Sequence, residues 1–165
     1  MHVFARGVRK HAIYLDDVDR HLYLVLLGQV VVRQGWRCLA YCLMKNHVHL
    51  LVETPQPNLA AGMHRLHGLH AQAFNKRHGH SGHVFQGRYG AVNVFWTSQL
   101  QAVARYIALN PVEAALCQEP AAWPWGSHAA VVGGTAPRWL DVARLLGYFG
   151  ADGGEPRQRY LDYVR

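Results

Sequence analysis

The chain has 165 residues, of which half are apolar and 16% are charged, so it can form one domain with a real core and is not a disordered chain. A formal net charge of +7 favours a polyanionic partner, with nucleic acid ranked before a membrane surface. Three cysteines are too sparse for a disulfide framework and favour a reducing cytoplasm, and the longest apolar run, 22–32, is too short to span a bilayer.

A short strand and a long helix are predicted first. Residues 2–8 are typical of a strand that ends at a glycine. The acidic run 16–19 begins a helix, because acidic side chains cap a helix N-terminus and interact favourably with its dipole. This helix runs to about Gln34, and Gly35 ends it. Its apolar residues lie on nearly all sides, so we expect it to be well covered.

A hairpin follows, with strands over 36–44 and 47–53 joined by Lys45-Asn46. Asparagine tolerates the left-handed conformation that such two-residue connections need. Asn58 then caps a second helix, in which apolar residues recur at helical spacing as far as Phe74.

The remaining elements complete the expected fold. A basic loop over 75–82 leads to a fourth strand over 84–95, which two glycines interrupt. A third helix is capped by Thr97 or Ser98 and is predicted to end at Asn110, because a residue before proline avoids the helical region.

The order βαββαβ predicts an α+β, ferredoxin-like antiparallel sheet with helices on one face, followed by an additional helix. We place one domain over 1–118. Residues 119–165 are expected to form an irregular C-terminal extension that contacts DNA, with a short helix near 141–146.

His47 and His49 begin the third strand. Successive strand side chains point to opposite faces, so these two share a face, about 6.5–7 Å apart, and can converge on one divalent ion. Paired strand histidines are also frequent as structural residues, so the pair alone leaves both interpretations open. Tyr106 and Asn110 stand i and i+4 on one face of the third helix. They are either a nucleophile and a carbonyl ligand, or a packing residue and a C-cap.

Three blocks of sequence, in this order, closely resemble one protein family. They are YCLMKNHVHLL at 41–51, GHVFQGRY at 82–89 and RYIALNPV at 105–112. The family is the single-tyrosine HUH transposases, and the nearest branch is the REP-associated tyrosine transposases. The resemblance runs from about residue 1 to 125.

The resemblance implies that His47 and His49 are metal ligands, that Asn110 completes the metal shell and that Tyr106 is the nucleophile. Mg²⁺ or Mn²⁺ suits mixed nitrogen and oxygen ligation with open positions. The ion would polarise a phosphate of single-stranded or hairpin DNA, and Tyr106 would attack it to leave a 5′-phosphotyrosine and a free 3′-OH. Strand transfer would need no ATP. The expected setting is the bacterial cytoplasm, at the nucleoid during action, with the protein as monomer or homodimer.

Three departures from the family pattern concern DNA contacts rather than the chemistry. Lys45 replaces a residue that is usually proline, and Glu113 and Ala115 stand where a basic residue and a glycine are frequent. Tyr89 is the main competitor as nucleophile, but it lies on the fourth strand, where the family usually has an aromatic residue, and we interpret it as structural.

Basic and aromatic side chains around these blocks suit a DNA substrate. The predicted DNA contacts are Arg6, Arg9, Lys10, Lys45, Arg65, Lys76, Arg77, Arg88 and Arg105. Base stacking, worth about 1–3 kcal/mol per base, is available from Phe85, Tyr89, Trp96, Trp123 and Trp125, of which Phe85 and Trp96 are expected in the core.

Two other functions fit parts of the pattern. A non-catalytic nucleic-acid-binding module with a ferredoxin-like sheet would present stacking aromatics on its middle strands, where this chain has histidines. A metallo-hydrolase built on the His-x-His pair would use water as nucleophile, but its common motif continues with Asp-His, where this chain has Leu50-Leu51.

Overall fold

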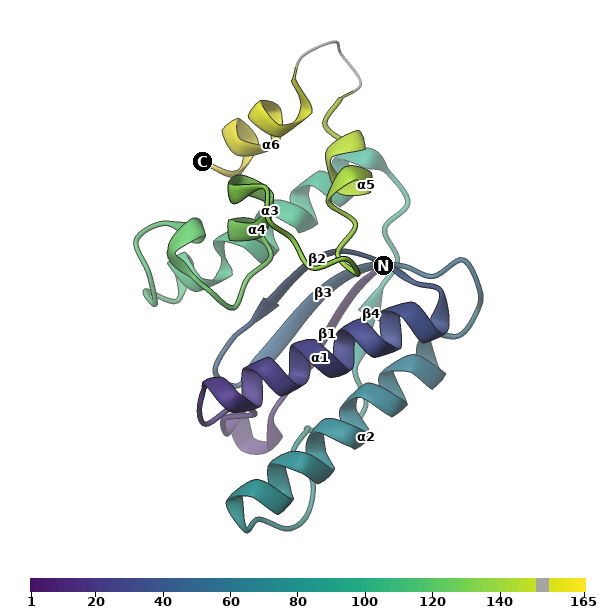
Figure 1. Cartoon of the computed structure of the whole chain (residues 1–165), viewed down its shortest axis with the longest axis vertical. Coiled ribbons are helices and arrows are strands. Elements are labelled where there is room, and N and C mark those ends of the chain that lie inside the picture. The colour runs from purple at the N-terminus through teal and green to yellow at the C-terminus, as the bar shows by residue number, and fades with distance from the viewer. Residues whose placement is uncertain (151–154) are drawn as a thin grey trace.

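The computed structural model describes residues 1–150 and 155–165 and is built around one antiparallel sheet (Figure 1). Its strands lie in the order β2-β3-β1-β4, which confirms the predicted ferredoxin-like fold. The strands are β1 (His2–Arg6), β2 (Arg37–Leu43), β3 (His47–Glu53) and β4 (Gly90–Val92). The fourth strand is much shorter than predicted, because Gly87 adopts a φ of +93° and breaks the extended chain before it.

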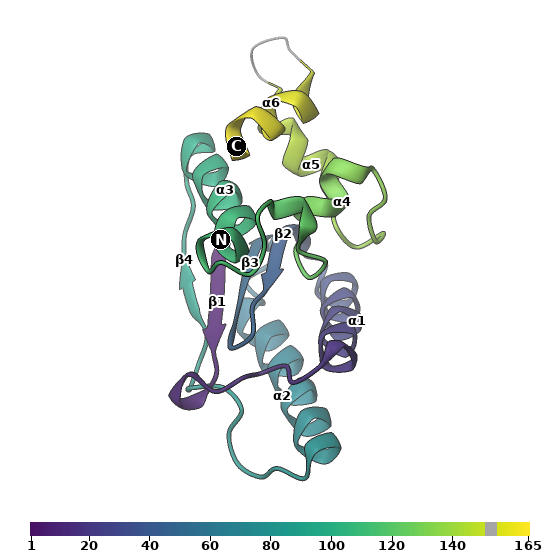
Figure 2. The same ribbon diagram turned by 90° about the vertical axis from the view of Figure 1, so that its left-hand side faces the viewer.

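Two long helices, α1 (Asp17–Gln34) and α2 (Leu59–His78), cover one face of the sheet (Figure 2). The α1 boundaries agree with the sequence: Asp16 and Asp19 form a capping box, and Gly35 ends the helix with a φ of +65°. Asn58 occupies the N-cap position of α2, as predicted, but its side chain makes no capping hydrogen bond: it accepts from Trp36 Nε1 and donates to the carbonyl of Gln34.

The expected full coverage of α1 is wrong. Val18, Val25 and Val32 are spaced seven residues apart, and all three are more than half exposed. Because seven residues are close to two helical turns, these valines form one stripe on the side that faces away from the sheet. The helix is therefore apolar on a solvent face as well as on its core face.

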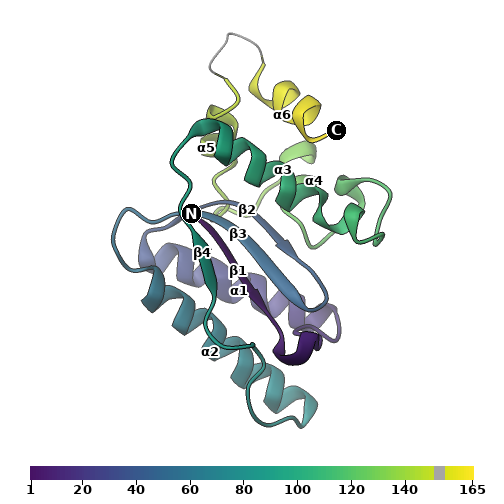
Figure 3. The same ribbon diagram turned by 180° about the vertical axis from the view of Figure 1, so that it is seen from behind.

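The second face of the sheet carries α3 (Thr97–Glu113) and the C-terminal segment, as Figure 3 shows. The extension is not irregular: it forms α4 (His128–Gly133), α5 (Val142–Gly147) and α6 (Pro156–Val164). Side chains of these helices share one apolar cluster with β2 and α3. The short helix expected near 141–146 is confirmed as α5, whereas α4 and α6 were not predicted. Short 3-10 helices span Val8–Lys10 and Pro120–Ala122.

The predicted end of α3 at Asn110 is also wrong, because the helix continues through Pro111. Pro111 is buried, and the carbonyl of Asn110 accepts a hydrogen bond from Ala114 N, so the last turn closes despite the missing proline N–H. No helix of the described residues is long and apolar enough to cross a bilayer.

The chain leaves α3 through Ala115, whose φ of +55° lies in the left-handed region. The left-handed conformation costs alanine about 1–2 kcal/mol, and it costs glycine less, even when the larger entropy that glycine loses on folding is included. We expect Ala115→Gly to raise the free energy of unfolding by roughly 0.5–1 kcal/mol. The matched control is Ala114→Gly, because Ala114 has a φ of −84°. Urea denaturation should show a higher free energy of unfolding for Ala115→Gly and a lower one for Ala114→Gly. A lower free energy of unfolding in both variants would contradict backbone strain at Ala115.

Candidate active site

The two histidines of β3 lie on the face of the sheet that α3 covers. In the register of the sheet, His49 stands opposite Phe4 and His47 opposite Arg6, both on β1. The two imidazole rings are 5.1 Å apart between centroids and nearly perpendicular. The alternation of the strand thus brings both rings to one place, as the sequence predicted.

Helix α3 brings its own pair of side chains onto these rings within a single chain. The Tyr106 ring stands edge-on to His49, with centroids 5.2 Å apart, and Asn110 Oδ1 lies 3.2 Å from His47 Nε2. Asn110 is buried, whereas Tyr106 is 42% exposed. The tyrosine is therefore open to a large substrate, while the amide is fixed beside the histidines.

A third histidine, His2, completes the cluster and was missed by the sequence reasoning. Its Nε2 lies 3.0 Å from His49 Nδ1, and its ring is 5.8 Å from that of Tyr106. His2 shares one face of β1 with Phe4 and Arg6, which are two and four residues further on, and Val3 and Ala5 lie on the opposite, buried face. The alternation was visible in the sequence, but the partner strand and its register were not.

Burial lowers the pKa of His2, His47 and His49, and for His49 the neighbouring histidines and Arg6 lower it further, to about 3. All three rings are thus neutral at pH 7 and present lone pairs. His47 lies between two amide oxygens, with Asn46 Oδ1 2.7 Å from Nδ1 and Asn110 Oδ1 3.2 Å from Nε2. A neutral imidazole has only one N–H, so one of these contacts brings two lone pairs together. A cation at that point would remove the conflict, and the donor set of nitrogen and amide oxygen fits a divalent ion.

The three histidines and Tyr106 line a cavity of about 520 Å³. Arg6, Gln86 and Arg88 line it together with the histidines. The cavity therefore joins neutral metal-type donors, an exposed phenol and two guanidinium groups, which is a set suited to a phosphodiester.

Residues 1–110 match the sequence profile of the family described as IS200-like transposases. This chain belongs to that family. Membership implies DNA cleavage and strand transfer.

Solved structures resemble the transposase in fold. One is a REP-associated tyrosine transposase bound to a REP hairpin, with a TM-score of 0.65 and 16% identity over 86% of this chain and 85% of that one. A candidate transposase from Deinococcus radiodurans R1 has a TM-score of 0.48 and 21% identity over 61% of this chain and 82% of its own. No curated protein gave a significant match.

Two of the predicted DNA contacts of the transposase, Arg6 and Arg88, line this cavity. Three more, Arg9, Lys10 and Lys45, lie in segments next to the start of β3, where Asn46 Nδ2 donates to the Lys10 carbonyl and Ile13 N donates to the Lys45 carbonyl.

The other four predicted contacts lie elsewhere. Arg65 lines a hollow beside α1 and Trp139, on the side of the sheet opposite α3. Arg105 donates to the carbonyls of Tyr163 and Arg165 and holds α6 in place. Lys76 and Arg77 lie in the last turn of α2, away from the cavity. These side chains do not converge on Tyr106.

The aromatic residues that were predicted to stack on bases also differ in their positions and roles. Phe85 is buried, as expected, but Trp96 is 69% exposed at the start of α3, so its prediction as a core residue is wrong. Trp125 is buried, and Trp123 donates from Nε1 to the carbonyl of Leu43, so both have packing roles. Tyr89 lines a different cavity from the one that contains Tyr106.

Arg77 belongs to a cluster that joins the start of α1 to the end of α2. It pairs with Asp16, at 2.5 Å, and with Asp19, which is 1% exposed and also bonds His78. Asp16, Asp19 and His78 have donor atoms close enough to hold an ion. The guanidinium already satisfies both carboxylates, however, and its hydrogen bonds hold the pKa of Asp16 well below its usual range. We therefore assign this cluster to stability.

We expect Arg77→Ala to lower the free energy of unfolding, because it removes one partner of the buried Asp19 carboxylate, which then keeps only its contacts with backbone N–H groups and His78. The loss should be below that of a fully buried pair, since the Arg77 side chain is 35% exposed. Lys76→Ala is the control, as Lys76 is exposed on the same turn. Equal losses of stability in the two variants, measured by denaturant titration, would contradict this assignment.

Proposed function

We propose that this transposase cleaves and rejoins single-stranded DNA at repeat hairpins through a covalent bond to Tyr106, with the help of Mg²⁺ or Mn²⁺. The observation that carries the proposal is the position of α3, which sets Tyr106 against His49 and Asn110 against His47 in one chain. His47, His49 and Asn110 would hold the ion, which would supply positive charge to the reacting phosphate.

The remaining side chains position the reactants. His2 bonds His49 Nδ1 and so fixes the orientation of that ring, as partners of metal-binding histidines do. Arg6 and Arg88 lie where they can bind the phosphates on either side of the scissile one. Because the Tyr106 side chain is exposed, the DNA strand can reach it without any opening of the core.

The chemical step exchanges one phosphoester for another. The Tyr106 oxygen loses its proton and forms a bond to the 5′ phosphorus, while the bond from phosphorus to the 3′ oxygen breaks and that oxygen gains a proton. A 3′-OH of a second strand reverses the step and regenerates the phenol. The phosphotyrosine preserves the ester bond between the two reactions, so no nucleotide hydrolysis is needed.

The proposed substrate is inferred from the net charge of the chain and from its similarity to a solved transposase structure. The chain carries a net charge of +7, and the solved transposase with a similar fold is bound to a REP hairpin. A duplex would hold each phosphate on the outside of a rigid rod, whereas a single strand can bend into a cavity under α3. Since one chain supplies the whole cluster, we propose that a monomer is sufficient. Its place of action would be the bacterial nucleoid.

Incubation with a DNA hairpin that carries single-stranded arms, in the presence of Mn²⁺, should yield a protein–DNA adduct that survives SDS. Tyr106→Phe should abolish the adduct, because it removes the attacking oxygen, and Tyr89→Phe should retain it. Denaturing gels with labelled DNA give the measurement. An adduct that persists in Tyr106→Phe and vanishes in Tyr89→Phe would show a different nucleophile, and cleavage with no adduct at any time would favour a metallo-hydrolase.

The metal site can be tested without DNA. Mn²⁺ binding followed by electron paramagnetic resonance should weaken at least about tenfold in His47→Ala and in His49→Ala, since each removes one of few ligands. His11→Ala is the control, because this histidine is exposed outside the cluster. Unchanged affinity in both ligand variants would refute the site.

A further inference from the structure

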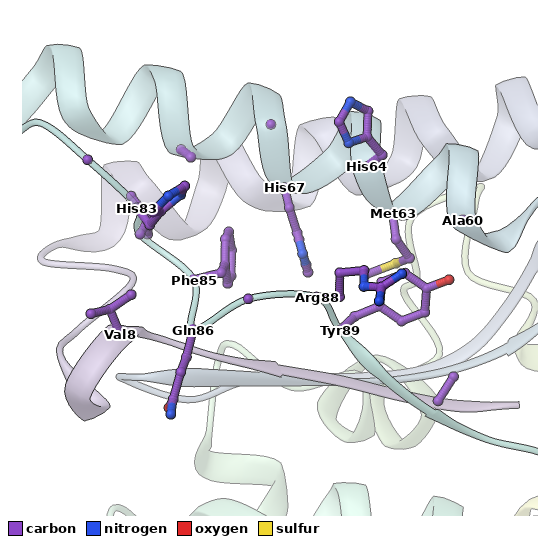
Figure 4. A pocket seen from close by; sticks show the side chains of 16 residues that line it. Val8, Ala60, Met63, His64, His67, His83, Phe85, Gln86, Arg88 and Tyr89 are labelled. Atoms are coloured by element: carbon purple, nitrogen blue, oxygen red, sulfur yellow. The ribbon is translucent and has the colours of Figure 1, made fainter.

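A second and larger cavity, of about 1040 Å³, lies between α2 and the segment 82–91 (Figure 4). The chemistry proposed above does not use it. Ala60, Met63 and Ala71 form part of its α2 side, and Val8 closes the opposite edge. The volume is at the upper end of the range for ligand sites and exceeds what a buried packing defect needs.

A stacked aromatic pair, the buried Phe85 and the partly exposed His67, lines this cavity and forms an aromatic wall. The two rings are stacked with centroids 4.0 Å apart and an interplanar angle of 16°. His67 is fixed by a contact of 3.4 Å with the Tyr23 hydroxyl, and burial lowers the pKa of His67 to about 3. The wall is therefore rigid, flat and uncharged at pH 7. Figure 4 shows Arg88 and Tyr89 beside Met63 at one end of it, and His83 at the other.

Arginine and histidine side chains surround the opening of the cavity, and its α2 side has free space at Gly68. Arg88, His64 and His83 are exposed around it, and the described residues that line it include no Asp or Glu. Gly68 on α2 also lines it, and a Cβ placed there would meet no atom within 4 Å. A flat ligand could therefore approach the helix backbone, and an anionic group would meet the Arg88 guanidinium without a carboxylate among the described lining residues.

The cavity adjoins the active-site cavity across the segment 86–88. Gln86 and Arg88 line both, and Gln86 N donates to the carbonyl of Arg6, which ties the segment to β1. Between them Gly87 has a φ of +93°, which lets the chain turn sharply. Figure 4 shows the Gln86 side chain directed away from α2. A strand that leaves Tyr106 therefore has to cross only this segment to reach the aromatic wall.

We propose that this cavity binds an unpaired nucleotide of the DNA strand held in the active site, with its base on the aromatic wall and its phosphate beside Arg88. The inference rests on the proposed function, because it takes that strand as the occupant. Stacking on aromatic rings accepts any base, so the wall supplies affinity, and the polar rim can select among bases. The cavity thereby fixes how far the unpaired arm extends from the reacting phosphate.

The test fills the cavity with a larger side chain, placed at Gly68 or at Ala71. Gly68→Met and Ala71→Met place a long side chain into it, and methionine favours the helix over glycine. Gln72→Met is the control, since Gln72 is exposed on α2 and does not line the cavity. The probe is a DNA hairpin with a single-stranded arm in which 2-aminopurine replaces one base at a time. Binding is measured in EDTA, where metal-dependent cleavage does not enter.

We expect fluorescence at one or two adjacent arm positions to change on binding, and this change to be lost in both filling variants, with affinity weakened about tenfold. Gln72→Met should behave as the parent protein, and circular dichroism should confirm that all variants are folded. No position-specific change, or an unaltered one in folded filling variants, would overturn the proposal, as would equal binding of a free 2-aminopurine nucleotide. The adduct assay does not enter this result, so failure here and failure of the Tyr106 chemistry are distinguishable.

Discussion

The packing of α3 across the sheet is the contact on which the site depends. Leu100 and Ile107 of this helix are buried against Leu39 and Leu51 of the sheet. Each such side chain contributes about 1.5–3 kcal/mol when removed from water. This apolar contact sets the rotation and height of the helix, and so it decides where the residues on the adjacent face, Tyr106 and Asn110, meet the two histidines.

The sheet can serve two purposes because its faces differ. One face is a conventional core, in which Val3, Val48 and Leu50 pack under α1 and α2. The other face carries the histidines at one end, and at the other end it carries the apolar residues against which α3 packs. Rigid strands thus hold the polar cluster, in which His2 and His49 hydrogen-bond to each other and His47 lies between the amide oxygens of Asn46 and Asn110.

The positive charge of the chain is divided between two roles. Arg6 and Arg88 line the active cavity, whereas Arg77 and Arg105 hold helices to one another and to the tail. Arg88 also stands between the active cavity and the larger one beside α2. Net charge therefore indicates the class of partner but overstates the number of contacts available to it.

The sequence by itself determined the order of elements, the limits of α1 and the shared face of His47 and His49, because capping residues and strand alternation act over a few neighbours. It also carried the family likeness, through the three blocks. It was wrong at the end of α3, which continues through Pro111, at Trp96, which is exposed, and in the extension, where α4 and α6 form by packing against β2 and α3.

Only the tertiary structure decided that His2 joins the cluster, since this depends on which strand pairs with β3 and in what register. It likewise decided that Arg77 is paired with two carboxylates and that Tyr89 and Tyr106 line different cavities. These outcomes rest on contacts between residues far apart in the chain, and local periodicity carries no information about such contacts.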